Sequence, residues 1–391
     1  MMRLKIMYTA KESSGLHRDQ DFAEEFKSHL LNLPMPEPVI IPLQRKILTP
    51  ENIGIQKPVM FKPAEIDKLL KRDKSRILAF DIGGTNPNCA LVINGRINEN
   101  SIQFIPHVKG KGIVTWIKKY IQSQKDISGI GFSIATEILP DGMLTIGSNI
   151  DNFYRELISE IGTANILDFT KRLIGTAIPI SAFNDGTAGA MSAVFNAYRK
   201  NHDLTTLYYL IYSTGIGGAY WNKYDMAIYP SELGHGPLAY EMNKFHIKTP
   251  CKIHPEYICL ENAGSRRIGL GKLLKKRMAE KEIHLFDPGQ LAAVYDFGAR
   301  IATHSIDALV QMDIGSFNGD NSAFVYHGGG FKAAGFAQRV TAMLEKQYRQ
   351  DGILSAGQHL NAFRTYDFSP NACLEGAALS TLLTAKKNFG L

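Results

Sequence analysis

The sequence predicts a mixed α/β fold made of two related lobes. The first observation is a strand, a glycine-rich turn and a second strand over residues 76–93. The second is the same pattern over residues 207–221, where apolar strands flank Ser-Thr-Gly-Ile-Gly-Gly. The third is the length of 391 residues with 45% hydrophobic residues, which is enough to bury two cores. Two such hairpins at domain-scale spacing indicate two units of the same construction.

The first hairpin has the composition of a phosphate-binding turn. A glycine-rich loop that opens a helix would indicate a dinucleotide or P-loop site, but here a second apolar strand follows. Asn94-Gly95 then turns toward a third predicted strand over residues 97–105. The carboxylate of Asp81 is a candidate ligand for Mg²⁺ or for its water. The turn offers phosphate oxygens the backbone amides and side-chain donors of Gly83, Gly84, Thr85 and Asn86.

Two further glycine clusters extend this pattern. The second hairpin carries Thr214, Gly215, Gly217 and Gly218 at its turn. Gly329 and Gly330 follow a short apolar strand and precede a helical pattern over residues 333–348, and such a helix start suits the adenosine or phosphates of a nucleotide. Each cluster by itself also fits an ordinary turn. The paired hairpins favour a shared polyphosphate site.

Asn184 and Asp185 end a predicted buried strand over residues 177–185 and precede a helix of small residues that permits close packing. Open α/β sheets place ligands and catalytic groups at the carboxyl ends of their strands. Helix capping is the alternative interpretation of this Asn-Asp pair. Its position within the series of phosphate-binding turns favours a catalytic role.

With these motifs the chain resembles the ROK-family sugar kinases, which belong to the actin, hexokinase and Hsp70-like superfamily. The resemblance covers residues 76 to the C-terminus and is most specific at Glu232-Leu-Gly-His235 followed by Cys259-Leu-Glu261. It implies two actin-like (ribonuclease H-like) lobes with a nucleotide and sugar cleft between them. It also implies ATP-dependent phosphorylation of a hexose or N-acetylhexosamine hydroxyl, as in a glucokinase, with ATP and Mg²⁺ as cofactors.

The resemblance assigns roles to individual residues. Asp185 corresponds to the general base that takes the proton of the sugar hydroxyl. ATP and its Mg²⁺ would lie between the two hairpins, with Asp81 as the magnesium ligand. The residues implied to contact the sugar are Asn149, Asn184, Glu232, His235 and Glu261. The family's Pro-Gly turn after the strand at residues 127–132 is replaced by Ser133-Ile-Ala-Thr-Glu137, which leaves the identity of the sugar open.

A zinc site is a second implication of the resemblance. The family pattern is Cys-x-Cys-x4-Cys-x-Glu, with the histidine of Glu-x-Gly-His as fourth ligand. Here Cys251, His254 and Cys259 follow His235, so a histidine stands where the family has its middle cysteine, and His246 is a further candidate. Thiolate and imidazole are both good zinc ligands. A loop of the same sequence without metal remains an equal alternative.

The sequence divides into an N-terminal extension and two lobes. Residues 1–75 form the extension, mostly irregular because of its prolines, with one amphipathic helix at 20–32. We expect this arm to wrap the first lobe or to mediate oligomer contacts before residues 64–70 lead into the core. The first lobe covers residues 76–195 and is closed by a returning helix at 372–387. The second lobe covers residues 196–371.

Composition narrows the class of protein. The net charge of +7 invites a nucleic-acid interpretation, but it is spread along the chain and also suits the anions ATP and sugar phosphate. The four cysteines do not form a disulfide framework, and the N-terminus lacks the apolar stretch of a signal peptide. We expect a cytoplasmic homo-oligomer that binds a small sugar and ATP but neither nucleic acid nor membrane.

Two alternatives remain open. A ROK-type sugar-responsive transcriptional regulator would show a helix-turn-helix pattern before residue 76, and none is found in the sequence. A catalytically silent sugar-binding protein would retain the sugar-contacting residues but lose Asp185 or the phosphate-binding turns, which are present.

Overall fold

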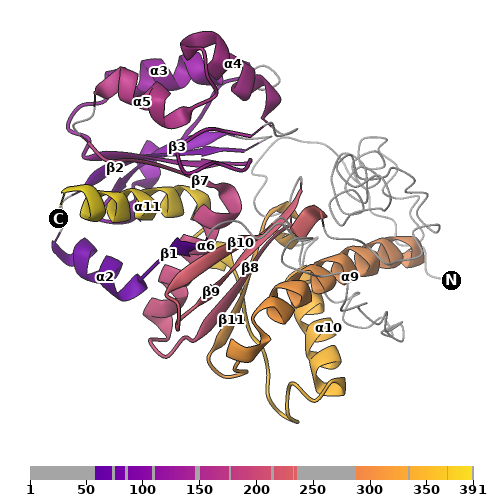
Figure 1. Cartoon of the computed structure of the whole chain (residues 1–391). Helices are drawn as coiled ribbons and strands as arrows, with labels where there is room; N and C mark the ends of the chain where they lie inside the picture. The colour runs from indigo at the N-terminus through magenta and orange to yellow at the C-terminus, as the bar shows by residue number, and fades with distance from the viewer. Residues whose placement is uncertain are drawn as a thin grey trace.

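The computed structural model describes residues 58–72, 75–83, 87–107, 111–145, 150–175, 178–212, 215–231, 233–235, 288–332, 335–367 and 369–389 (Figure 1). Within these ranges the chain forms two six-stranded sheets with helices packed on both faces of each. The predicted two-lobed α/β fold is therefore confirmed. The predicted helix over residues 20–32 lies outside the described ranges.

The first sheet begins with an antiparallel meander and continues with two parallel strands. Its strands are β2 (Arg76–Ile82), β3 (Asn88–Ile93), β4 (Arg96–Ile97), β5 (Gln103–Phe104), β6 (Gly129–Ile134) and β7 (Ile180–Asn184). The order is β4-β3-β2-β6-β7, with β5 also paired to β3. β2 is antiparallel to β3 and parallel to β6, which is parallel to β7.

The prediction of one continuous strand over residues 97–105 is wrong. A 3₁₀ turn at Glu99–Ser101 separates β4 from β5. The hydroxyl of Ser101 accepts a hydrogen bond from the backbone of Leu91 at 2.8 Å and donates one to the carbonyl of Asn98 at 2.6 Å. A side chain thus replaces a strand partner here, which is a common behaviour of serine in turns.

The second sheet repeats the arrangement of the first. Its strands are β8 (Thr206–Tyr212), β9 (Ile216–Asn222), β10 (Ala227–Ser231), β11 (Ser322–His327), β12 (Asn361–Arg364) and an added edge strand, β1 (Val59–Met60). The order β10-β9-β8-β11-β12 again combines a meander with two parallel strands, which matches the recurrence of hairpins in the sequence.

The described end of the N-terminal arm joins the second sheet, whereas the arm was expected to wrap the first lobe or to mediate oligomer contacts. β1 pairs antiparallel with β10 and so covers backbone groups that an edge strand would expose. Phe61 is fully buried, and its carbonyl accepts a hydrogen bond from the indole N–H of Trp221 at 3.0 Å. The arm then continues as α2 (Pro63–Arg72), which packs against the helices between the sheets.

The helices and sheets form alternating layers (Figure 1). α3 (Ile113–Ser123), α4 (Asp151–Ile161) and α5 (Ile166–Ile174) cover the outer face of the first sheet. α6 (Asp185–Lys200) and α11 (Ala372–Phe389) lie between the two sheets. α9 (Pro288–Met312) and α10 (Phe336–Gln350) cover the outer face of the second sheet. Three apolar cores result, one on each outer face and one in the middle.

The middle layer depends on a close approach of two helices. A Cβ atom at Gly376 of α11 would lie 1.7 Å from the carbonyl oxygen of Ala188 in α6, so no larger residue fits. α11 also packs on β2, β6 and β7 of the first sheet, while α6 packs on β8 and β9 of the second. The small residues that the sequence places in α6 thus bring the two lobes together at this point.

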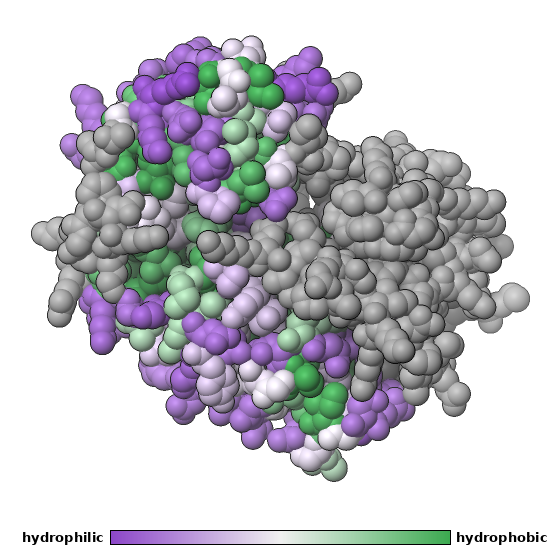
Figure 2. Space-filling view, in the orientation of Figure 1, coloured by the Kyte–Doolittle hydropathy of each residue, from purple (hydrophilic) through white to green (hydrophobic). Residues whose placement is uncertain are grey.

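In the view of Figure 2, the described surface of both lobes is largely hydrophilic, with hydrophobic residues interspersed on each lobe and between them. No helix in the described ranges is long and apolar enough to cross a membrane.

Candidate functional site

Two carboxylates lie at the carboxyl ends of the parallel strands of the first sheet, near enough for their charges to interact. Asp81 lies near the end of β2, and Asp185 is the first residue of α6, directly after β7. Ser133 of β6 stands in register with Asp81, and its hydroxyl donates a hydrogen bond to the Oδ1 atom of Asp81 at 3.0 Å. Parallel strands bring their carboxyl ends to one edge of a sheet, so residues distant in sequence gather there.

Electrostatics at this edge favour a bound cation. Burial raises the pKa of Asp81 to about 7, and the negative charge of Asp185 adds to the shift, while the hydrogen bond from Ser133 opposes it. Two carboxylates that repel each other provide hard oxygen ligands, which suit Mg²⁺. Among the described residues no group of three or more His, Cys, Asp or Glu could hold a metal. Mg²⁺ needs only one or two carboxylates when waters and phosphates complete its shell, so the pair fits this ion.

Asn184 caps the helix that carries Asp185. Its Oδ1 atom accepts a hydrogen bond from the backbone of Gly186 at 2.9 Å, and its Nδ2 atom donates to the carbonyl of Thr136 at 3.1 Å. Oδ1 of Asp185 also accepts from the backbone of Gly186 at 2.9 Å. The capping interpretation therefore describes the side chain of Asn184, and the cap fixes the start of α6 against the loop after β6.

The first residues of β9, in the second hairpin, lie beside this helix start. A Cβ atom at Gly186 would be 3.8 Å from the backbone nitrogen of Gly218, so the two lobes approach each other next to Asp185. Cβ atoms at Gly83 and Gly217 would have no neighbour within 4 Å, so packing does not require glycine there. Among the described residues, none fills the space next to Gly83 and Gly217, where a ligand could approach the backbone. Gly215 precedes β9 in the second hairpin.

The third glycine cluster lies against the same edge of the second sheet. Gly328 has φ +101°, and a Cβ atom there would lie 2.4 Å from the carbonyl oxygen of Tyr212, at the end of β8. The prediction that Gly329 and Gly330 open a helix is wrong in detail. They lie in a 3₁₀ turn (Gly329–Lys332), and α10 begins only at Phe336 because Gly335, with φ +73°, caps it in the left-handed conformation.

Several predicted site residues lie outside the described part of the chain. These are Gly84, Thr85, Asn86, Asn149, Thr214, Glu232, Glu261 and the zinc candidates Cys251, His254 and Cys259. His235 has a described backbone, at the end of a 3₁₀ turn (Leu233–His235) after β10. The residues that the described structure gathers are Asp81, Gly83, Asn184, Asp185, Gly215, Gly217 and Gly218, with Gly329 and Gly330 on the neighbouring strand end.

Sequence reasoning missed the groups that lie directly around the two carboxylates. In the sequence, Ser133 stands out only within the segment that replaces the family's Pro-Gly turn, and no motif marks Cys373. The thiol of Cys373 donates to the carbonyl of Asp185 at 3.7 Å, because the start of α11 packs against the start of α6. The position of Ser133 at the end of a strand neighbouring β2 was a usable signal. No local signal identified Cys373, which arrives from the far end of the chain.

Comparisons with known proteins agree with this fold. No protein-family model and no curated protein sequence matches the chain. A ROK family glucokinase from Streptomyces griseus, solved in complex with glucose and AMPPNP, superposes with a TM-score of 0.52 at 19% identity, covering 78% of this chain and 98% of that chain.

Two further solved structures share the fold. A ROK hexokinase from Thermus thermophilus gives a TM-score of 0.52 at 17% identity, and the match covers 80% of this chain and 100% of the hexokinase chain. A ROK family transcriptional regulator, a homolog of the E. coli MLC protein, gives 0.51 at 15% identity, covering 80% of this chain and 81% of that chain. At these identities the likeness shows a common two-lobed α/β fold, shared by kinases and by a regulator.

Proposed function

We propose that this protein is an ATP-dependent sugar kinase that phosphorylates a hydroxyl of a hexose or an N-acetylhexosamine. The observation that carries the proposal is the proximity of Asp81 and Asp185 at the carboxyl ends of β2 and β7, beside Gly218 of β9. A phosphoryl transferase needs a cation ligand, a base for the attacking hydroxyl and backbone amides for phosphates in one place. The described geometry supplies candidates for all three.

Each carboxylate takes one role in the proposed reaction. Asp185 accepts the proton of the sugar hydroxyl and orients its oxygen toward the γ-phosphate. Asp81 holds Mg²⁺ or one of its waters, and this ion would neutralise charge on the phosphates. The hairpin turns, with Gly83 to Asn86 in one lobe and Thr214 to Gly218 in the other, hold the polyphosphate, and Gly329 and Gly330 contact the nucleotide.

The sugar is proposed to lie deeper between the lobes. The residues proposed to bind its other hydroxyls are Asn149, Asn184, Glu232, His235 and Glu261. A site that hydrogen-bonds hydroxyls rejects analogues that lack them, because its buried polar groups would be left unpaired. Closure of the lobes, proposed as residues 76–195 with 372–387 and residues 196–371, would exclude water as a competing acceptor. ATP as donor makes a cytoplasmic location part of the proposal.

The zinc site is a separate proposal within the same function. His235, Cys251, His254 and Cys259 provide two thiolates and two imidazoles, a common tetrahedral ligand set. Elemental analysis should find about one zinc per chain, and Cys259→Ser should release it and weaken sugar binding. Cys89→Ala is the control, because Cys89 lies in β3 and is buried in the core on the outer face of the first sheet, away from the proposed ligands in sequence. Metal-free protein with full sugar affinity would contradict the zinc site and leave the loop without metal as the remaining interpretation.

A coupled assay of ADP release over a panel of sugars tests the main proposal. Hexoses and N-acetylhexosamines are supplied with ATP in the presence and absence of Mg²⁺. We expect ADP release that depends on both one class of sugar and the metal. A broad panel that produced no sugar-stimulated ADP would remove the kinase proposal.

The likeness to a transcriptional regulator makes DNA binding the second candidate function. Fold does not discriminate between the two, because sites and not folds carry function. The paired carboxylates favour the kinase, since a sensor of sugar has no need of a base. Retention of the protein on DNA in the absence of sugar, with no turnover of ATP, would favour the regulator instead.

A further inference from the structure

Tyr209 in β8 is a buried tyrosine whose hydroxyl has no hydrogen-bond partner among the described residues. Three other fully buried tyrosines have one: Tyr208 donates to the carbonyl of Asp313, Tyr326 contacts the hydroxyl of Thr341, and Tyr348 donates to Asp307. An unsatisfied buried hydroxyl costs about 1–3 kcal/mol. Phenylalanine would fill the same space without that cost, so the hydroxyl of Tyr209 needs a reason.

The hydroxyl lies against the helix that begins with Asp185. A Cβ atom at Gly189 of α6 would lie 2.0 Å from this oxygen, so only glycine allows the approach. Gly189 follows Asp185 by four residues, and residues four apart stand one above the other on the same face of a helix. Tyr209 therefore reaches α6 one turn below Asp185, on the face where Asp185 begins the helix.

The chemistry around Tyr209 keeps its hydroxyl a donor. Burial raises its pKa well above the usual range, and the charges of Cys373, Asp185 and Tyr366 raise it further. The ring stacks on His327 with centroids 6.1 Å apart, so its orientation is fixed by a neighbouring strand. A ring held in this orientation presents its hydroxyl to α6, where the O–H group can donate one hydrogen bond.

We infer that Tyr209 is a positioning residue for Asp185 and that its hydroxyl donates to an ordered water which in turn donates to the carboxylate. A buried water typically needs two to four polar partners, and those available are the hydroxyl of Tyr209, the carboxylate of Asp185 and the thiol of Cys373. The water holds the carboxylate in the rotamer that faces the substrate. This inference rests on the proposed function, because it assigns Asp185 a reactive role.

Tyr209→Phe tests the inference, with Tyr208→Phe as the matched control. Tyr208 is the next residue in β8 and equally buried, but it faces the other side of the sheet and has a protein partner. Tyr209→Phe should lower kcat about tenfold, which corresponds to about 1.4 kcal/mol of the barrier. KM for ATP and sugar should stay within about twofold, because the hydroxyl is buried against α6 and is proposed to act only through Asp185. The melting temperature should change little, since the hydroxyl bonds a water and its loss leaves no protein group unpaired.

The control should give the opposite pattern, with kcat unchanged and a lower melting temperature. Unchanged kcat in Tyr209→Phe would overturn the inference, and so would a joint loss of stability and of substrate affinity, which would mark a structural hydroxyl. A crystal structure of the wild-type protein gives a readout that does not depend on turnover. It should show a water within hydrogen-bond distance of both Tyr209 and Asp185. Its absence overturns the inference, whereas a wild-type protein without kinase activity overturns the proposed function alone.

Discussion

At the scale of single residues, Asp81 and Asp185 are the same side chain at the same edge of a sheet, but their proposed roles differ. Asp185→Asn keeps the size of the side chain and removes its ability to accept a proton. We expect kcat to fall by about 10²–10⁴-fold, the usual contribution of a positioned general base. KM for sugar and ATP should change little. Steady-state kinetics with both substrates varied measure kcat and KM separately.

Two companion variants sharpen this prediction. Asp203→Asn changes an exposed carboxylate in the turn before β8 and should leave kcat unchanged. Asp81→Asn should weaken the dependence of the reaction on Mg²⁺ more than it weakens sugar affinity, because it removes a proposed metal ligand. Near-normal turnover of Asp185→Asn would mean that the base lies elsewhere in the chain.

The residues of the candidate site were predictable from sequence to different degrees. Asp81 lies near the end of an apolar strand and Asp185 directly follows one, so the apolar pattern and the position in it identify both residues. Ser133 and Tyr209 reach the site through sheet register and through a helix contact, which no local pattern encodes. Cys373 arrives from the last helix of the chain because α11 packs against α6. Tertiary packing supplies these neighbours, and sequence spacing does not report it.

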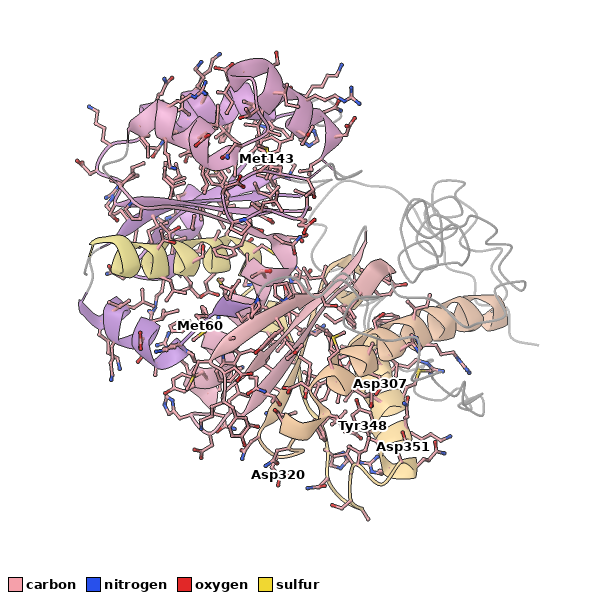
Figure 3. The ribbon with its side chains drawn as sticks, viewed as in Figure 1. Met60, Met143, Asp307, Asp320, Tyr348 and Asp351 are labelled. Atoms are coloured by element: carbon pink, nitrogen blue, oxygen red, sulfur yellow. The ribbon has the colours of Figure 1, made fainter. Side chains whose placement is uncertain are left out.

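At the scale of elements, the interface between α9 and α10 contains a buried carboxylate with no part in the proposed reaction. Asp307 of α9 accepts hydrogen bonds from the hydroxyl of Tyr348 at 2.9 Å and from the side-chain amides of Gln311 and Gln347 at 3.2 and 3.3 Å (Figure 3). Burial raises its pKa above 3.8, and these hydrogen bonds oppose the shift. The charged form of the Asp307 carboxylate therefore destabilises the folded protein as the pH rises.

The sign of this shift gives a prediction for stability. A carboxyl group with a raised pKa in the folded state binds its proton more tightly there than in the unfolded chain. Its contribution to stability is complete below pH 3.8 and is lost as the pH rises through the raised value. The wild-type free energy of unfolding should thus fall relative to Asp307→Asn, by up to about 1.4 kcal/mol per pH unit within this window.

Urea unfolding between about pH 4 and pH 8 measures the two slopes. The comparison uses slopes because Asp307→Asn also alters hydrogen bonds, which shifts the whole curve by a nearly constant amount. Asp320→Asn is the control, since Asp320 is exposed in the turn before β11 (Figure 3). Parallel curves for the wild type and Asp307→Asn would show that Asp307 does not titrate in this range.

Helices and strands were predictable from the sequence where a long periodic pattern of apolar residues defined them. The hairpin strands, β7 and the last helix agree with the sequence prediction within a few residues. The strand over residues 97–105 failed because Ser101 satisfies backbone groups in a turn, and the helix after β11 began late because Gly335 caps it. In both places side-chain or backbone chemistry of single residues overrode the apolar pattern.

At the scale of the whole molecule, the chain passes through the middle layer twice. α6 connects β7 of the first sheet to β8 of the second, and α11 follows β12 of the second sheet and packs on the first. Repetition of a hairpin in the sequence predicted two lobes. It could not predict how they join, because the contact of α6 with α11 involves residues almost two hundred positions apart.

Gly376→Ala tests this junction. Gly-to-Ala substitution inside a helix ordinarily stabilises by about 1 kcal/mol through propensity. Here the new methyl group would lie 1.7 Å from the carbonyl oxygen of Ala188, so α11 must move away from α6. Overpacking of this kind costs about 1–3 kcal/mol or more, so we expect the free energy of unfolding to fall by about 3 kcal/mol.

The sign of the change in unfolding free energy shows whether helix propensity, which stabilises, or overpacking, which destabilises, is the larger effect. Gly315→Ala is the control, because a Cβ atom at Gly315 has no neighbour within 4 Å and the residue is exposed in a 3₁₀ turn. Its unfolding free energy should change by less than about 0.5 kcal/mol. Ala188 lies one turn after Asp185, so a displaced α11 also disturbs the start of α6, and kcat of the folded variant should fall. A Gly376→Ala protein more stable than the wild type would show that propensity wins and that the two helices do not touch as described.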